Sequence, residues 1–281
     1  MICEKIDLYE YFGVERGKAT GGYLGVCASD YMTEMPNAVR PAMIVMPGGG
    51  YEFLSEREAE PVALAFAAKG YAALILYYTL RTAYPTPLVE ACMAVSYVRK
   101  NADKLFVDPA HVGAIGFSAG GNLAAMLATM HGDKAVQAVL GKGNYRADAV
   151  VLSYAVATTG ERTSHGGTSK IISGGDSALR KKVSPDLNVR SDSSPVFIWH
   201  TMEDDAVPVE GVMLYAEACK KHGVPFAMHI FEHGWHGLGL CDDVVNERLS
   251  ETVAAERVDK WFPLAIDWLY SRGFKVVHNK K

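Results

Sequence analysis

The chain has 281 residues, of which 49% are apolar and 21% are charged, and its formal net charge is -4 at pH 7. This balance is typical of a globular protein and argues against disordered and fibrous classes. The longest apolar runs are shorter than the roughly 20 residues of a membrane span, no signal peptide is visible, and no basic run favours nucleic acid or an anionic membrane as a partner.

Five cysteines are present at wide spacings, and no CxxC motif occurs. An odd number without clustering argues against a disulfide framework and favours a reducing, cytoplasmic setting. The length alone is compatible with one large domain or two small ones.

Short apolar runs that are typical of strands alternate with longer segments of helical periodicity. The predicted strands cover 42–46, 71–78, 111–117, 149–154, 196–200 and 226–231. The predicted helices cover 56–69 (bent by Pro61), 87–101, 119–130, 209–222 and about 254–270. This alternation predicts an α/β fold with a mostly parallel sheet and helices on both faces. The segment 158–194, rich in Gly, Ser, Thr and Asp, interrupts it and is expected to form a small cap or loop insertion.

A G-x-S-x-G motif at 116–120 joins the predicted strand 111–117 to the predicted helix 119–130. In that setting the serine lies on a sharp turn with strained backbone, and the glycines are required because a Cβ would collide with neighbouring chain. The start of the helix also offers unpaired N–H groups to a developing oxyanion. The alternative is an ordinary serine cap in a glycine-rich turn. The strand and helix on either side favour Ser118 as a nucleophile.

A serine hydroxyl needs a base and an orienting acid to act as a nucleophile. In a sheet of this type the acid and then the histidine follow the serine, each on a loop after a later strand. The loop after 196–200 contains Glu203, Asp204 and Asp205, and the loop after 226–231 contains His233 and His236. We predict Asp204 as the acid, with the two flanking acids as solvated loop charges. We predict His236 as the base, with His233 as the second choice.

Three consecutive glycines follow the first predicted strand, in the sequence MPGGGY at 46–51. Successive glycines allow backbone N–H groups to point together at an anion. A dinucleotide-binding motif fails because Phe53 stands where its third glycine is needed, and a P-loop lacks its Gly-Lys-Ser/Thr. We therefore predict an oxyanion loop, in which the N–H of Gly49 or Gly50 acts together with the N–H of Ala119.

A zinc site would have to combine His233 and His236 with Cys241 or Asp242. No H-E-x-x-H motif or regular Cys/His spacing supports such a site. We predict no metal and no cofactor.

Taken together, these features resemble those of the α/β-hydrolases over about residues 20–272, so a single domain spanning 1–281 is expected. Within that superfamily the chain is similar to small esterase/lipase-like proteins grouped with acetylxylan esterases and feruloyl-esterase-like enzymes. The motifs that carry this likeness are PGGGY at 47–51, SEREAEPVALAF at 55–66, GFSAGGNLAA at 116–125, HTMEDDAVPVE at 200–210 and GWHGLGL at 234–240. The resemblance implies the same acid and base, and it adds Glu56 or Glu60 as a group close to the oxyanion loop.

The resemblance also implies an activity, that of a serine carboxylesterase forming an acyl-enzyme. The implied substrates are short-chain esters, acetyl esters of xylo-oligosaccharides among them. Tyr51 and Trp235 are then expected to stack on sugar rings, although Trp235 stands where a smaller residue is often found. The alternatives are hydrolysis of a peptide or formamide bond with the same triad, and a non-catalytic binding protein on this scaffold. An intact Ser-His-Asp set argues against the last of these. The oligomeric state cannot be read from the sequence.

Overall fold

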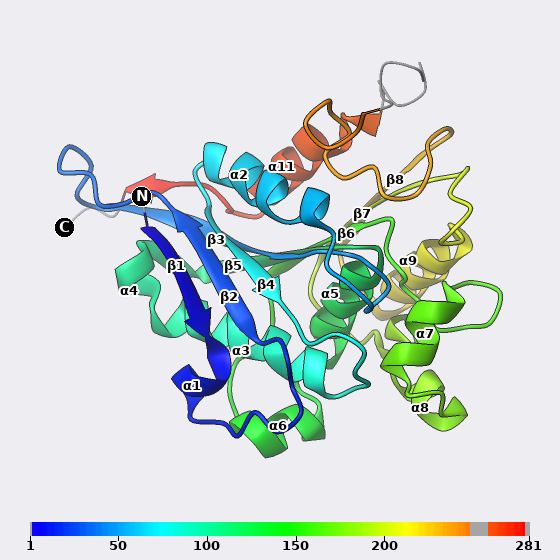
Figure 1. The fold of residues 1–281 in the computed structure, drawn as a ribbon. Helices are drawn as coiled ribbons and strands as arrows, with labels where there is room; N and C mark the ends of the chain where they lie inside the picture. The colour runs from blue at the N-terminus through cyan, green and yellow to red at the C-terminus, as the bar shows by residue number, and fades with distance from the viewer. Residues whose placement is uncertain (1, 248–257, 279–281) are drawn as a thin grey trace.

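The computed structural model describes residues 2–247 and 258–278. Within these residues, nine strands form one mixed sheet in the order β1-β2-β4-β3-β5-β6-β7-β8, and β9 pairs with β3 (Figure 1). In the part of this order that runs from β4 through β3 to β8, every pair of neighbouring strands is parallel. The pairs β1–β2, β2–β4 and β3–β9 are antiparallel. The strands are β1 Ile2–Asp7, β2 Tyr23–Ala28, β3 Ala38–Met46, β4 Ala72–Tyr77, β5 Val107–Phe117, β6 Ala149–Ser153, β7 Val196–Thr201, β8 Phe226–Phe231 and β9 Val277–His278. The predicted α/β fold is confirmed.

Helices cover both faces of the sheet, with α3, α5 and α9 on one side and α2 and α11 on the other (Figure 1). The α-helices are α1 Leu8–Phe12, α2 Glu60–Ala68, α3 Thr86–Lys100, α4 Ala102–Leu105, α5 Ser118–Met130, α6 Lys134–Leu140, α7 Gly166–Ile172, α8 Ser177–Lys182, α9 Glu210–His222 and α11 Trp261–Ser271. Two short 3-10 helices are η1 Glu56–Glu58 and η2 Pro185–Asn188. Among the described helices, none combines the length and apolar character needed to cross a bilayer.

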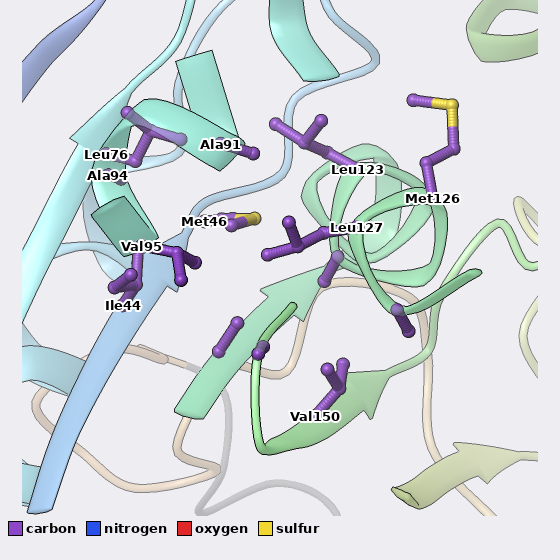
Figure 2. Close-up of a cluster of buried hydrophobic side chains, with 14 of the residues drawn as sticks. Ile44, Met46, Leu76, Ala91, Ala94, Val95, Leu123, Met126, Leu127 and Val150 are labelled. Carbon is purple, nitrogen blue, oxygen red and sulfur yellow. The ribbon is translucent and has the colours of Figure 1, made fainter. Parts of the chain in front are cut away.

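Helix α5 is the central support of the functional site, because it begins at Ser118 and is buried along its whole length. Its small and apolar residues fit between the sheet and α3, as expected for a helix without a solvent face. Figure 2 shows Ala91 and Val95 of α3 and Leu123 and Leu127 of α5 gathered around Met46 of β3. The first turn of α5 is therefore anchored in close-packed core.

Two predicted helices differ from those observed. The segment predicted as one helix over 56–69 is divided into η1 and α2, with non-helical backbone at Ala59 (φ -102°, ψ -98°). Pro61 lies in the first turn of α2, where its missing N–H costs no hydrogen bond, so it begins this helix and does not bend it. For the last predicted helix, residues 254–257 lie outside the described residues, and α11 begins at Trp261.

Candidate active site

The side chains predicted to form the site gather at one edge of the sheet. Ser118 directly follows β5, Asp204 lies in the loop after β7, and His236 lies in the loop after β8. The glycine loop at 47–51 follows β3, which neighbours β5. Because the carboxyl ends of parallel strands lie at the same edge, segments distant in sequence meet in the crevice there.

A continuous hydrogen-bonded series joins the three predicted triad residues. His236 Nε2 lies 2.8 Å from Ser118 Oγ, and His236 Nδ1 lies 2.7 Å from Asp204 Oδ2. Ser118 and Asp204 are 8% and 9% exposed, and the His236 side chain is 22% exposed. The imidazole therefore lies between a buried carboxylate and a hydroxyl at distances that permit proton transfer.

Backbone groups of its own loop hold the Asp204 carboxylate. Its Oδ1 accepts the N–H of Ala206 at 3.0 Å and of Val207 at 2.8 Å, which leaves Oδ2 directed at His236. Although burial acts to raise the pKa of Asp204, the hydrogen bond and charge of His236 and the Val207 N–H outweigh it and lower that pKa. Asp204 is therefore ionised at neutral pH.

The other acids and the second histidine of these loops lie elsewhere. Asp205 is exposed. His233 Nδ1 lies 2.9 Å from Glu203 Oε1, and this hydrogen bond raises the pKa of the exposed His233. Glu203 is exposed, as expected of a solvated loop charge, and it is in addition paired with His233. The two histidines contact different acids, and no group of three His, Cys, Asp or Glu side chains in the described part of the chain is arranged to hold a metal ion.

The turn at Ser118 has the strained backbone expected of a nucleophile on a strand-to-helix junction. Ser118 has φ +51°, in the left-handed region that non-glycine residues rarely adopt. A Cβ on Gly120 would lie 2.1 Å from the carbonyl oxygen of Met46 and 2.3 Å from that of Pro47. The absence of a side chain at Gly120 therefore allows α5 to approach Met46 and Pro47, at the start of the glycine loop.

Gly120→Ala is expected to lower the free energy of unfolding by about 3 kcal/mol or more, because rigid backbone surrounds the added methyl group. Urea denaturation measures the loss. Gly132→Ala is the matched control, since a Cβ there meets nothing within 4 Å, and its effect should stay within about 0.5 kcal/mol. Equal effects of the two substitutions would contradict the close-approach argument.

The glycine loop presents its amides to the crevice. Gly49 and Gly50 have φ +119° and +66° and line the pocket beside Ser118, and their N–H groups find no acceptor among the described residues. The N–H of Ala119 lies in the first turn of α5, where no intrahelical acceptor exists. The Gly48 N–H, in contrast, is bound by Glu58 Oε2 at 2.7 Å. These positions are compatible with the predicted oxyanion donors, Gly49 or Gly50 together with Ala119.

Tyr51 corrects one of the predicted substrate contacts. It is 0% exposed, its hydroxyl donates to Asn122 Oδ1 at 3.0 Å, and its ring packs edge-on against Tyr78. A ring enclosed in this way cannot stack on a sugar. Trp235 is half-buried and lines a neighbouring depression with Arg57, and it is not among the residues that line the pocket at Ser118.

Of the two glutamates that the resemblance places near the glycine loop, only Glu56 lines the same pocket as Gly49 and Gly50, and neither is the glutamate bound to the loop. Glu60 is exposed, and Glu56 is exposed on the pocket wall. The buried glutamate that contacts the loop is Glu58, between them in the sequence. The break in helical geometry at Ala59 turns Glu58 inward, which a continuous helical periodicity over 56–69 does not anticipate.

The pocket at Ser118 has a volume of about 890 Å³ and includes two residues that sequence reasoning missed. Phe53, 61% exposed, lies on the wall next to Gly49. His165 reaches the pocket from the segment 158–194, together with Gly167 of α7. Phe53 follows the glycine loop closely in the sequence, and this position indicates that it lies near the pocket. Nothing in the local sequence pattern identifies His165.

A mostly parallel sheet, a serine on a strand-to-helix turn, and an acid and a histidine on later loops define an α/β-hydrolase. The family model described as BD-FAE matches residues 30–218, and the chain belongs to that family. The predicted esterase-like α/β-hydrolase identity is thereby confirmed.

Similar proteins include enzymes that act on xylan and on esters. The chain is 35% identical over 212 residues to endo-1,4-beta-xylanase B of Butyrivibrio fibrisolvens, covering 73% of this chain and 33% of that protein. It is 30% identical over 208 residues to an acetylxylan esterase of Xylanibacter ruminicola, covering 71% and 41%. An acetyl ester-xyloside bifunctional hydrolase from Caldicellulosiruptor lactoaceticus has a similar structure, with a TM-score of 0.76, 37% identity and coverage of 90% and 89%. The chain thus spans about a third to two fifths of the length of these two curated relatives.

Proposed function

We propose that the chain is a serine carboxylesterase that hydrolyses short-chain esters, in particular acetyl esters of xylo-oligosaccharides. The observation that carries the proposal is the series Asp204–His236–Ser118, with contacts of 2.7 and 2.8 Å, beside the glycine loop. The acyl and sugar parts of the proposal are supported by the names of an acetylxylan esterase and an acetyl ester-xyloside hydrolase among the similar proteins.

The proposed mechanism gives each of these groups a defined role. Ser118 Oγ attacks the ester carbonyl while His236 Nε2 takes its proton, and ionised Asp204 stabilises the imidazolium through Nδ1. The N–H groups of Gly49 or Gly50 and of Ala119 stabilise the tetrahedral oxyanion. His236 then protonates the departing alcohol, and it activates the water that releases the acid from the acyl-enzyme.

A substrate panel tests this function. Acetate, butyrate and octanoate esters of p-nitrophenol are compared by kcat/KM with acetylated xylo-oligosaccharides, whose acetate release is measured directly. We expect the acetate ester to be the best p-nitrophenyl substrate and the acetylated oligosaccharides to be hydrolysed. Hydrolysis of p-nitrophenyl esters without release of acetate from the oligosaccharides would support the esterase activity but contradict the proposed sugar specificity.

Phe53 and His165 are proposed to contact the sugar, in place of Tyr51. The exposed ring of Phe53 offers a flat apolar surface on the pocket wall. His165 Nδ1 lies 3.2 Å from the backbone N of Thr168 and 2.9 Å from Thr168 Oγ1. With Nδ1 as the acceptor of the Thr168 N–H, the neutral ring carries its proton on Nε2. Burial, followed by the charge of His236, lowers the pKa of His165 and favours this neutral form. His165 can therefore donate a hydrogen bond to a substrate hydroxyl.

His165→Asn is expected to raise KM for acetylated xylo-oligosaccharides about 3- to 10-fold, the effect of one lost hydrogen bond. The kcat/KM for p-nitrophenyl acetate, which has no sugar hydroxyl, should change less than about 2-fold. Asparagine is chosen because it retains the N-cap that His165 provides to α7. Equal losses on both substrates would contradict a sugar contact.

A further inference from the structure

A buried carboxylate, Glu58, lies between the oxyanion loop and the loop that carries His236. Its Oε2 accepts the N–H of Gly48 at 2.7 Å, and its Oε1 accepts the hydroxyl of Tyr154 at 2.6 Å. The same Tyr154 oxygen accepts the N–H of Gly239 at 2.9 Å. One carboxylate and one phenol thus connect residue 48, just before the predicted oxyanion donors, to residue 239, three residues after the predicted base.

Tyr154 also contacts the base directly. It follows β6 with φ +35°, and its ring meets the His236 ring edge-on with centroids 5.0 Å apart. The other side chains around it are large and buried, since Trp199 and Phe117 both contact its ring. Its hydroxyl therefore has little freedom, and the hydrogen bonds to Glu58 and Gly239 hold it in a single position.

Both partners of Glu58 are donors, so its two carboxyl oxygens act as acceptors. Burial raises the pKa of Glu58, and the hydrogen bonds from Tyr154 and Gly48 and the nearby His236 reduce that rise without cancelling it. The surroundings at Gly48 are equally tight, since a Cβ there would lie 2.7 Å from Glu58 Oε2 and 2.9 Å from Ser118 Cβ. Gly48 therefore has no room for a side chain between Glu58 and Ser118.

We propose that Glu58 is a positioning residue that aligns the oxyanion loop with the base before substrate binds. Through Gly48 it sets the orientation of the loop whose next amides face the oxyanion, and through Tyr154 it fixes the loop of His236. Donors held in place beforehand need no reorganisation as charge develops on the substrate, and this is the source of their catalytic benefit. The inference rests on the proposed esterase function.

Glu58→Gln tests the proposal at constant side-chain shape. The amide oxygen can accept one of the two donors, and the NH2 group then faces the other donor. Rates are divided by the concentration of titrated active sites. We expect kcat for p-nitrophenyl acetate to fall about 10- to 100-fold, which does not exceed the effect of losing one oxyanion donor. The KM should change less than about 3-fold. Inhibition by a trifluoromethyl ketone, whose adduct with Ser118 carries the same oxyanion, should weaken by a similar factor.

Two further variants separate positioning from folding. Tyr154→Phe keeps the ring beside His236 and removes only the hydroxyl, so it should show a smaller loss of the same kind, and the double variant should be less than additive. Glu60→Gln is the control, because the Glu60 side chain is exposed and makes no hydrogen bond with the described residues. Unchanged kcat and inhibitor affinity per active site in Glu58→Gln would overturn the proposal, even with a lower Tm. If that variant does not fold, an unchanged Tyr154→Phe overturns it instead. An inactive wild-type chain would contradict the esterase function itself.

Discussion

Ser118→Ala is expected to reduce hydrolysis of p-nitrophenyl acetate by a factor of about 10⁵ to 10⁶ in kcat. The atom removed is the one that lies 2.8 Å from His236 Nε2, so the base would face no nucleophile and no acyl-enzyme could form. The residual rate, about 10³ to 10⁴ above the reaction in water, should come from substrate binding and the oxyanion donors. Initial rates and covalent labelling by a fluorophosphonate, which modifies only the wild-type serine, measure the loss.

The fold should survive this substitution. Alanine at 118 has the same backbone cost at φ +51° as serine, so the free energy of unfolding should change by less than about 1 kcal/mol. Circular dichroism and urea denaturation provide that control. Activity above a tenth of the wild-type value in a folded Ser118→Ala variant would show that the nucleophile lies elsewhere.

The placement of Ser118 could be predicted because its signals are local. A buried parallel strand is a continuous apolar run, and β5 ends in a glycine-flanked serine followed by the small residues of α5. Chain order then limited the acid and the base to two short loops. Asp204 and His236 meet Ser118 in the structure because β7 and β8 end at the same edge of the sheet as β5.

The remaining features depend on contacts between distant segments, which a local pattern does not contain. Tyr51 looks like an exposed loop aromatic in the sequence, but Asn122 of α5 and Tyr78 after β4 enclose it. Glu58 is one of three glutamates at alternate positions, and only its contacts with Gly48 and Tyr154 set it apart. His165 directly precedes α7, in a segment whose sequence shows no clear periodicity to indicate which side chain turns toward the pocket.

Asp204→Asn is expected to reduce kcat by about 10³- to 10⁴-fold. Two backbone N–H groups bind Oδ1, so the amide oxygen of the asparagine must take that position and its NH2 group must face His236 Nδ1. Nδ1 would then accept a hydrogen bond and the ring proton would move to Nε2, which faces Ser118 Oγ at 2.8 Å. A protonated Nε2 cannot take the serine proton, so the loss arises from the wrong tautomer in an otherwise unchanged site.

Asp205→Asn is the matched control, because Asp205 is the next residue in the same loop and is exposed. Its kcat should stay within about 2-fold of the wild-type value, as expected for a surface substitution with little effect on the site. The kcat of both variants is measured with p-nitrophenyl acetate after active-site titration, so that partial unfolding does not count as lost turnover. Equal losses in the two variants would contradict Asp204 as the acid, and a loss confined to Asp205→Asn would move that role to its neighbour.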